Sequence, residues 1–187
     1  MPTDRFSGLV LGTNLSGTDN ADGTITIDAT GGGGGVLVGC KVYKYNNQTV
    51  NDTTTTVIQF DGEDFDTDGF HDNATNNTRL TVPTGLGGTY LVSFTIATTN
   101  GTGNNAVGSR QTRIWKNGIV NLLGSDQRPS ASGIAADVAG VFVSQLADGD
   151  YIEFEYWQNS GGSLIAVGAG PGGPHRHIAT LAMVKVG

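Results

Sequence analysis

The chain has few cysteines, few charges and few strong helix formers, and each scarcity argues against a class of protein. One cysteine, Cys40, in 187 residues excludes an intrachain disulfide framework and a metal site built from several cysteines. Charged residues make up 14% of the chain, against about 25% in an average globular domain. Glycine, a poor helix former, is abundant, with 30 residues, while Glu, Lys, Leu and Met are scarce. We therefore do not expect a helical bundle.

The balance of charge argues against nucleic acid as a partner. Ten Lys and Arg stand against seventeen Asp and Glu, which gives a formal net charge of −7, and the sequence has no basic run. No stretch approaches the ~18 apolar residues of a transmembrane helix. Residues 1–5 lead into no apolar signal-peptide core. We expect no nucleic-acid partner, no membrane insertion and synthesis in the cytoplasm without a signal peptide.

A run of five glycines, residues 31–35, divides the chain. It has no side chain to pack and predicts a flexible linker. Residues 1–30 contain one clear strand pattern, Thr24–Ile27, for which the apolar stretch Gly8–Gly12 is a candidate partner. Because about 30 residues bury too little surface to fold alone, we expect this segment to anchor the protein on another molecule. A frayed tail is the alternative.

Residues 36–187 form the main body, in which strand patterns recur at short intervals between polar turns. The predicted strands are Val36–Tyr43, Thr56–Phe60, Arg79–Pro83, Gly88–Ile96, Arg110–Lys116, a strand within Ile134–Ala147, Tyr151–Trp157 and His177–Val186. About eight to ten strands without a helix predict an all-β fold, an antiparallel jelly-roll sandwich with a short N-terminal β segment.

Alternation within these strands predicts which side chains face the core. In residues 88–96 the large apolar side chains fall on one face, which we expect to be buried. Glu153 and Glu155 fall opposite the apolar residues of their strand and should face solvent. The apolar stretch Val141–Val143 is typical of a buried strand.

Five short motifs occur in a recognisable order along the body. They are Phe60-Asp61 with an acidic loop ending in Phe70-His71-Asp72, then Leu80–Pro83, Gly88–Phe94, Ile114–Gly118 and Leu146–Ile152. This order resembles the globular domain of complement component one-q and the wider tumour-necrosis-factor-like jelly rolls, over residues 38–186. The loop cysteines of that family are absent, and Ala179–Met183 replaces its closing Phe-x-Gly pattern. The resemblance implies a homotrimer with an apolar face on the threefold axis.

The N-terminal part resembles a different group of proteins. Gly12–Ser16 followed by Asp19–Asp28 is similar to a segment common in virion proteins of tailed phages. An attachment piece, a glycine joint and a trimeric jelly roll together resemble a capsid decoration protein or head fibre. The resemblance implies a non-enzymatic protein, made in the host cytoplasm, on the capsid surface of a virion. It would dock through its N-terminal segment on the major capsid protein or another virion protein.

Two other functions stay open at this point. One is the receptor- or glycan-binding tip domain of a phage tail or head fibre, with a host surface glycan as partner. The other is a secreted ligand of the complement one-q type, which the missing signal peptide and cysteine pattern disfavour.

The acidic loop of residues 61–72 is the richest in candidate ligands. Asp64, Asp66 and Asp68 followed by a glycine match the opening of a calcium loop, in which hard oxygen ligands surround a hard cation. The twelfth position of that pattern is Thr75 instead of Glu, and no helix pattern flanks the loop, which excludes an EF-hand. A looser Ca²⁺ site is one hypothesis, and a solvated acidic loop without a cofactor is the other.

His175 and His177 form the second candidate metal site. A strand would aim both imidazoles at the same side, and the pairs of three chains in a trimer could surround a transition metal. Because one chain offers two ligands, this hypothesis depends on threefold symmetry. Two ordinary histidines at a strand edge are the alternative.

We find no convincing catalytic motif in the sequence and do not expect an enzyme. Residues 168–173 fit G-x-G-x-x-G by letter, but Pro171 interrupts them and no helix pattern follows. Cys40 lies in an apolar stretch, where we expect an inert buried thiol. Trp115, Tyr156 and Trp157 would either stack on sugars or, as we favour, pack in the core or in a subunit interface.

Overall fold

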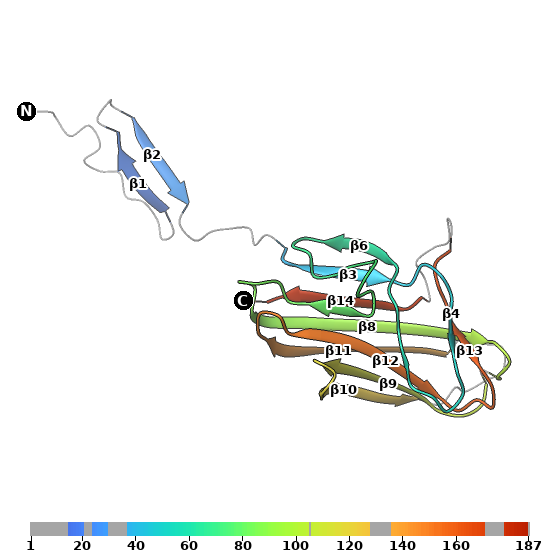
Figure 1. Cartoon of the computed structure of the whole chain (residues 1–187). Helices are drawn as coiled ribbons and strands as arrows, with labels where there is room; N and C mark the ends of the chain where they lie inside the picture. The colour runs from blue at the N-terminus through green and yellow to red at the C-terminus, as the bar shows by residue number, and fades with distance from the viewer. Residues whose placement is uncertain are drawn as a thin grey trace, which may run out of the picture. The chain divides into compact units, whose positions relative to one another are not determined.

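The computed structural model describes residues 15–20, 24–29, 37–104, 106–127, 136–170 and 178–186. The chain divides into two compact units, Met1–Val36 and Leu37–Gly187, and each is described by itself (Figure 1). Every regular element within the described residues is a strand. None of these residues belongs to a helix of the length and hydropathy that crossing a membrane requires.

The first unit contains an antiparallel hairpin. Strand β1 (Leu15–Asp19) pairs with β2 (Ile25–Ala29), and Asn20 ties the turn end together by donating its side-chain amide to Thr24 Oγ1 and Thr26 Oγ1 at 3.0 and 2.9 Å. The strand expected near Thr24–Ile27 is therefore present. It pairs with β1, the segment just before the turn, because a short connection brings adjacent segments together. The stretch 8–12 considered as its partner lies outside the described residues.

The main unit is a sandwich of two antiparallel sheets. The seven-stranded sheet has the order β4 (Gln48–Val50), β13 (Leu164–Ala166), β8 (Gly88–Asn100), β14 (Thr180–Lys185), β3 (Gly39–Tyr43) and β6 (Gly62–Asp66), with β11 (Ala136–Leu146) paired to β8. The five-stranded sheet has the order β10 (Val120–Gln127), β9 (Arg110–Lys116), β12 (Tyr151–Gln158) and β5 (Thr56–Val57), with β7 (Arg79–Thr81) also paired to β12. The all-β antiparallel jelly-roll prediction is confirmed.

Strand β8 organises the larger sheet. Strand β11 pairs with one of its edges from Gly88 to Thr98, over the full length of β11, while β14 and β13 share the other edge end to end. Figure 1 shows β8 between β14 and β11 across the body. Its predicted core face is correct, since Tyr90, Val92, Phe94 and Ile96 are all buried.

The core lies between the two sheets and is closed by aromatic contacts. The ring of Phe94 on β8 lies 4.9 Å, between centroids, from the ring of Phe154 on β12. Strand β12 alternates as expected, with Ile152, Phe154 and Tyr156 buried and the two glutamates on the other face. Aromatic contact across the sandwich thus joins the central strands of the two sheets.

The prediction that Val141–Val143 is buried is wrong for its two valines. Val141 and Val143 are 62% and 59% exposed, and only Phe142 packs against the core. The register of β11 explains this, because Val141 lies opposite Ser93 and Val143 opposite Leu91, all on the face away from the core.

The acidic segment expected to be a loop is in part a strand. Residues 62–66 form β6, which pairs with β3 from Cys40↔Asp66 to Tyr43↔Gly62. Acidic residues have low β propensity, so this segment forms a strand because it pairs with the buried strand β3. Strands β4 and β13 were also not expected, and the segment at 56–60 forms only the two-residue β5.

Candidate functional surfaces

The carboxylate of Asp66 closes the turn that follows β6. Its Oδ1 accepts hydrogen bonds from the backbone N–H groups of Asp68, Gly69 and Phe70 at 3.3, 2.9 and 2.9 Å. Its Oδ2 accepts one from the backbone N–H of His71 at 2.9 Å. Both oxygens therefore satisfy the donors of one tight turn, which is a common use of aspartate.

The other two aspartates of the predicted calcium loop have partners of their own. Asp64 Oδ2 lies 2.6 Å from Lys41 Nζ, and Asp68 Oδ2 accepts a hydrogen bond from Thr67 Oγ1 at 2.6 Å. Across the described ranges, no three His, Cys, Asp or Glu side chains are grouped as a metal site requires. The Ca²⁺ site at Asp64, Asp66 and Asp68 stays a prediction.

The histidines lie in different settings. His175 and His177 are outside the described residues, so their metal site also stays a prediction. The side chain of His71 is buried, with Nδ1 2.9 Å from Glu63 Oε1, and Asn73 donates its side-chain amide to the same oxygen. These contacts fix the start of the loop after the acidic turn.

The seven-stranded sheet turns one face away from the core, and apolar side chains gather on it. Leu91 on β8, Val141 and Val143 on β11, and Val184 on β14 form this apolar patch. Val143, Leu91 and Val184 lie side by side in one row of the sheet, because Leu91 is the cross-strand partner of both valines. Leu91 is 40% exposed, so the patch leaves substantial apolar area uncovered within the chain.

A hollow of about 520 Å³ lies on the same face, nearer the other end of the strands. Its polar lining includes Lys41, Ser93, Thr95, Asp137 and Thr180. Thr95 Oγ1 and Thr180 Oγ1 lie 2.9 Å apart, which links β8 and β14 beneath the hollow. The open face thus has an apolar part and a polar part.

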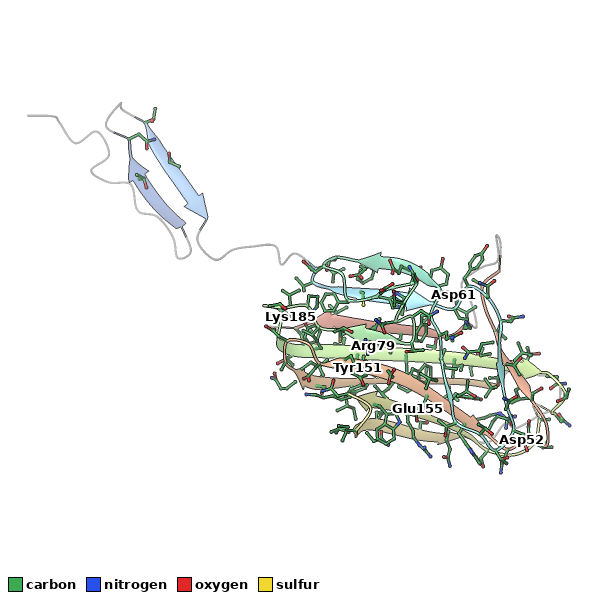
Figure 2. The ribbon with its side chains drawn as sticks, in the orientation of Figure 1. Asp52, Asp61, Arg79, Tyr151, Glu155 and Lys185 are labelled. Carbon is green, nitrogen blue, oxygen red and sulfur yellow. The ribbon has the colours of Figure 1, made fainter. Side chains whose placement is uncertain are left out.

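The open face of the five-stranded sheet carries aromatic and charged side chains instead. Trp115 donates its indole N–H to Glu155 Oε2 at 2.5 Å, across β9 and β12. The guanidinium of Arg79 lies 4.7 Å above the ring of Tyr151 in a cation–π contact. Figure 2 labels both residues, and Glu155 on the same sheet. Trp115 and Trp157 are half-buried on this face, so neither packs in the core, and their packing in a subunit interface stays a prediction.

Two further expectations concern buried groups. Tyr156 is fully buried, which confirms core packing for this residue and removes it from any sugar-stacking surface. Cys40 is also fully buried, and burial, reinforced by Asp66 and Glu63, raises the pKa of its thiol far above the usual range. A thiol held protonated is a poor nucleophile, in agreement with the expected inert cysteine.

Sequence reasoning missed most residues of the two open faces. Leu91 and Val184 alternate with core residues, and nothing in their own strands marks them as exposed together. Gly124 on β10 could have pointed to an irregular strand at this position, because a glycine inside a strand often marks a bulge or a close approach of another group.

No protein-family model matches the chain, and no curated protein matches it either. Solved structures do match. Murine APRIL superposes with a TM-score of 0.57 and 12% identity over 81% of this chain and 100% of that one. The globular domain of the zebrafish complement 1qA protein superposes with a TM-score of 0.53 and 14% identity, over 80% of this chain and 98% of that one.

The main unit is a jelly roll of the complement one-q and tumour-necrosis-factor type. The Eiger TNF of S. frugiperda adds a third match, with a TM-score of 0.53 and 12% identity over 81% of this chain and 93% of that one. The matches confirm the fold that the five motifs implied. At these identities they establish the fold alone.

Proposed function

We propose that this protein is a non-enzymatic structural protein of a phage virion that assembles as a homotrimer through the open face of its seven-stranded sheet. The observation that carries the assembly is the apolar patch. A contiguous exposed apolar surface on a folded domain is typical of a protein interface. Closed symmetry is the common way to bury such a surface between identical chains.

The surroundings of the apolar patch support this role. In the neighbouring row the residues of the two middle strands β8 and β14, Ser93 and Ala182, are small, so the backbones of facing sheets can approach closely there. The centres of subunit interfaces are depleted in charge, and the nearest charged pair on this face, Lys41 with Asp64, lies at the sheet edge formed by β3 and β6.

The N-terminal unit supports attachment to another virion protein. A two-stranded hairpin such as β1–β2 is marginally stable alone and gains stability by docking on a larger surface. Ile27, on β2, is 51% exposed and is available for such a contact. With the virion-like sequence of this segment, these features favour docking on the major capsid protein, as a decoration protein or head fibre does.

A glycan-binding tip domain of a phage fibre is the second candidate function. One observation favours it, namely the two half-buried tryptophans on the open face of the five-stranded sheet.

Multi-angle light scattering of the whole chain tests the assembly. We expect a mass three times the 19.3 kDa of one chain. Val141→Asp should yield monomers, because it places a charge within the apolar patch that the trimer would bury. Ile119→Asp is the matched control, since Ile119 is 79% exposed in the connection between β9 and β10, on the other sheet. A stable monomer of the unmodified chain at micromolar concentration would refute the trimer.

Electron microscopy of purified virions tests the location. Density for the trimer at regular positions of the capsid lattice supports a decoration protein or head fibre. Density at the tail tip supports the second candidate instead.

A further inference from the structure

We propose that the open face of the five-stranded sheet binds a neutral oligosaccharide, with one hexose unit in a hollow beside Arg113 and a neighbouring unit stacked on Trp115. The site lies on the opposite sheet from the apolar patch, so it does not depend on the proposed trimer. It gives the second candidate function a ligand class and a location.

The hollow has a volume of about 260 Å³, and the residues around it are polar or small. It is lined by Gln111, Thr112, Arg113, Asn121, Gly124 and Ser125. The guanidinium of Arg113 and the carboxamides of Gln111 and Asn121 together supply many donors and several acceptors. Adjacent sugar hydroxyls each donate and accept, so a mixed set of this kind suits them better than it suits an apolar ligand.

A bulge and a glycine on β10 create this space. The register between β10 and β9 shifts between Asn121 and Leu123, and bulges of this type re-aim side chains at sheet edges. Gly124 lies opposite Arg113 and presents no side chain to the open face. A Cβ atom there would lie 3.7 Å from both Asn121 Nδ2 and the carbonyl oxygen of Thr112, at ordinary contact distance. Packing would therefore permit a side chain, and its absence leaves the hollow open.

Trp115 provides a fixed aromatic side chain in the row next to the hollow. It is the cross-strand partner of Asn121, which lines the hollow, and of Glu153 on β12. Its hydrogen bond to Glu155 holds the indole in one orientation. Aromatic faces attract the C–H groups of a pyranose ring, and a preordered side chain loses little entropy when a ligand binds.

The charges of this face favour a neutral sugar over an acidic one. Arg113 faces Glu155 across the strands and donates Nη2 to Gln111 Oε1 at 3.0 Å. Glu153 lies in the next row, where it accepts a hydrogen bond from Thr78 Oγ1 at 3.1 Å. Arg79 and Arg113 balance the two carboxylates on this face, which suits a neutral sugar, while the net charge of −7 on the whole chain disfavours a carboxylated sugar or a phosphate.

A microarray of neutral and sialylated oligosaccharides, probed with the whole chain, is the first test. We expect binding to neutral hexose-containing glycans and none to their sialylated forms. The best neutral glycan is then titrated by calorimetry against the unmodified chain and its variants.

Two variants remove the two parts of the site. Gly124→Val fills the hollow and Trp115→Leu removes the stacking surface, and each should weaken binding about tenfold or more. Gly124→Ala should give an intermediate loss, because its methyl group fills less of the space. Ala74→Val, in an exposed turn of the connection between β6 and β7, introduces the same side chain outside the lining of the hollow and should leave binding unchanged. Melting curves establish that each variant is folded.

Three outcomes would overturn the inference: no binding to any neutral glycan, stronger binding to sialylated forms, or equal binding by folded Gly124→Val. These outcomes are separable from failure of the proposed function. A monomer that binds neutral glycans keeps this site and refutes the trimer, whereas a trimer that binds none does the reverse.

Discussion

Asp61 and Lys44 face each other with 3.6 Å between Oδ1 and Nζ, and the side chain of Lys44 is only 3% exposed. The same carboxylate accepts hydrogen bonds from the backbone N–H of Tyr45 at 2.6 Å and from the side-chain amide of Asn46 at 2.7 Å. One side chain just before β6 therefore fixes the segment that leaves β3. This arrangement orders the edge of the seven-stranded sheet.

The stability of the protein should fall in acid partly because of Asp61. Burial opposes ionisation, but the hydrogen bonds from Tyr45 and Asn46 and the charge of Lys44 outweigh it, so the pKa of Asp61 lies below its usual value. The unfolded state then binds protons more readily, and the free energy of unfolding drops as the pH falls from the usual aspartate pKa of 3.8 through the lower folded value.

Asp61→Asn tests this contribution. It should cost about 2 kcal/mol at neutral pH, because it weakens charge-assisted hydrogen bonds and leaves Lys44 buried without an anion. Urea unfolding at neutral and acidic pH measures both effects. An Asp61→Asn variant with the acid sensitivity of the unmodified chain would contradict the assignment.

Phe94→Ala should cost about 3–5 kcal/mol, because it leaves a cavity between the central strands of the two sheets, where Phe94 meets Phe154. Thr99→Ala, at an exposed position of the same strand, should change the free energy of unfolding by less than about 0.5 kcal/mol. Chemical denaturation of both variants checks the difference. Similar losses in the two would mean that the sheets do not pack as described.

Deletion of residues 1–29 should abolish binding to virus particles and leave the trimer intact. The main unit holds its own core, so its folding does not need the N-terminal unit. Co-sedimentation with particles lacking the protein measures binding, and light scattering measures the trimer. Loss of the trimer on deletion would instead make the N-terminal segment part of the assembly.

Removal of divalent cations should leave the melting temperature unchanged, because Asp66 is engaged by backbone N–H groups and Asp64 by Lys41. A melting temperature that falls when chelator is added to the unmodified chain, but does not fall for Asp68→Ala, would establish a Ca²⁺ site. A ligand bound only by the folded state stabilises that state. Asp68 is the better variant, because Asp66→Ala disrupts the turn itself.

Elemental analysis of the purified protein tests His175 and His177. Any transition metal bound there should be lost as acid protonates imidazole near pH ~6.5. Absence of such a metal would leave these residues as ordinary histidines.

Alternation in the sequence predicted the long strands well, because each of them buries one face in a local pattern. Strand β9 has the predicted bounds, Arg110–Lys116, and β12 extends one residue beyond them, to Gln158. Strand β13 has three residues, too few for a periodic signal, and its existence depends on pairing with β4 and β8 from distant parts of the chain.

The candidate surfaces were harder to predict for a different reason. A valine such as Val141 is equally suited to a core and to the surface that forms a subunit interface. Only the register of β11 with β8 distinguishes the two positions. The aspartates at 64, 66 and 68 resemble metal ligands because carboxylates that bind cations also cap turns. The choice between these roles depends on which donors the fold brings near.

The apolar patch and the open face that carries Trp115 belong to different sheets of one sandwich. A trimer closed through the seven-stranded sheets would therefore present three five-stranded sheets outward. A single sugar contact of modest strength would then be repeated around each trimer, and again over every trimer on a particle. Binding to a surface dense in glycans would rise far more steeply with glycan density than the affinity of one site implies.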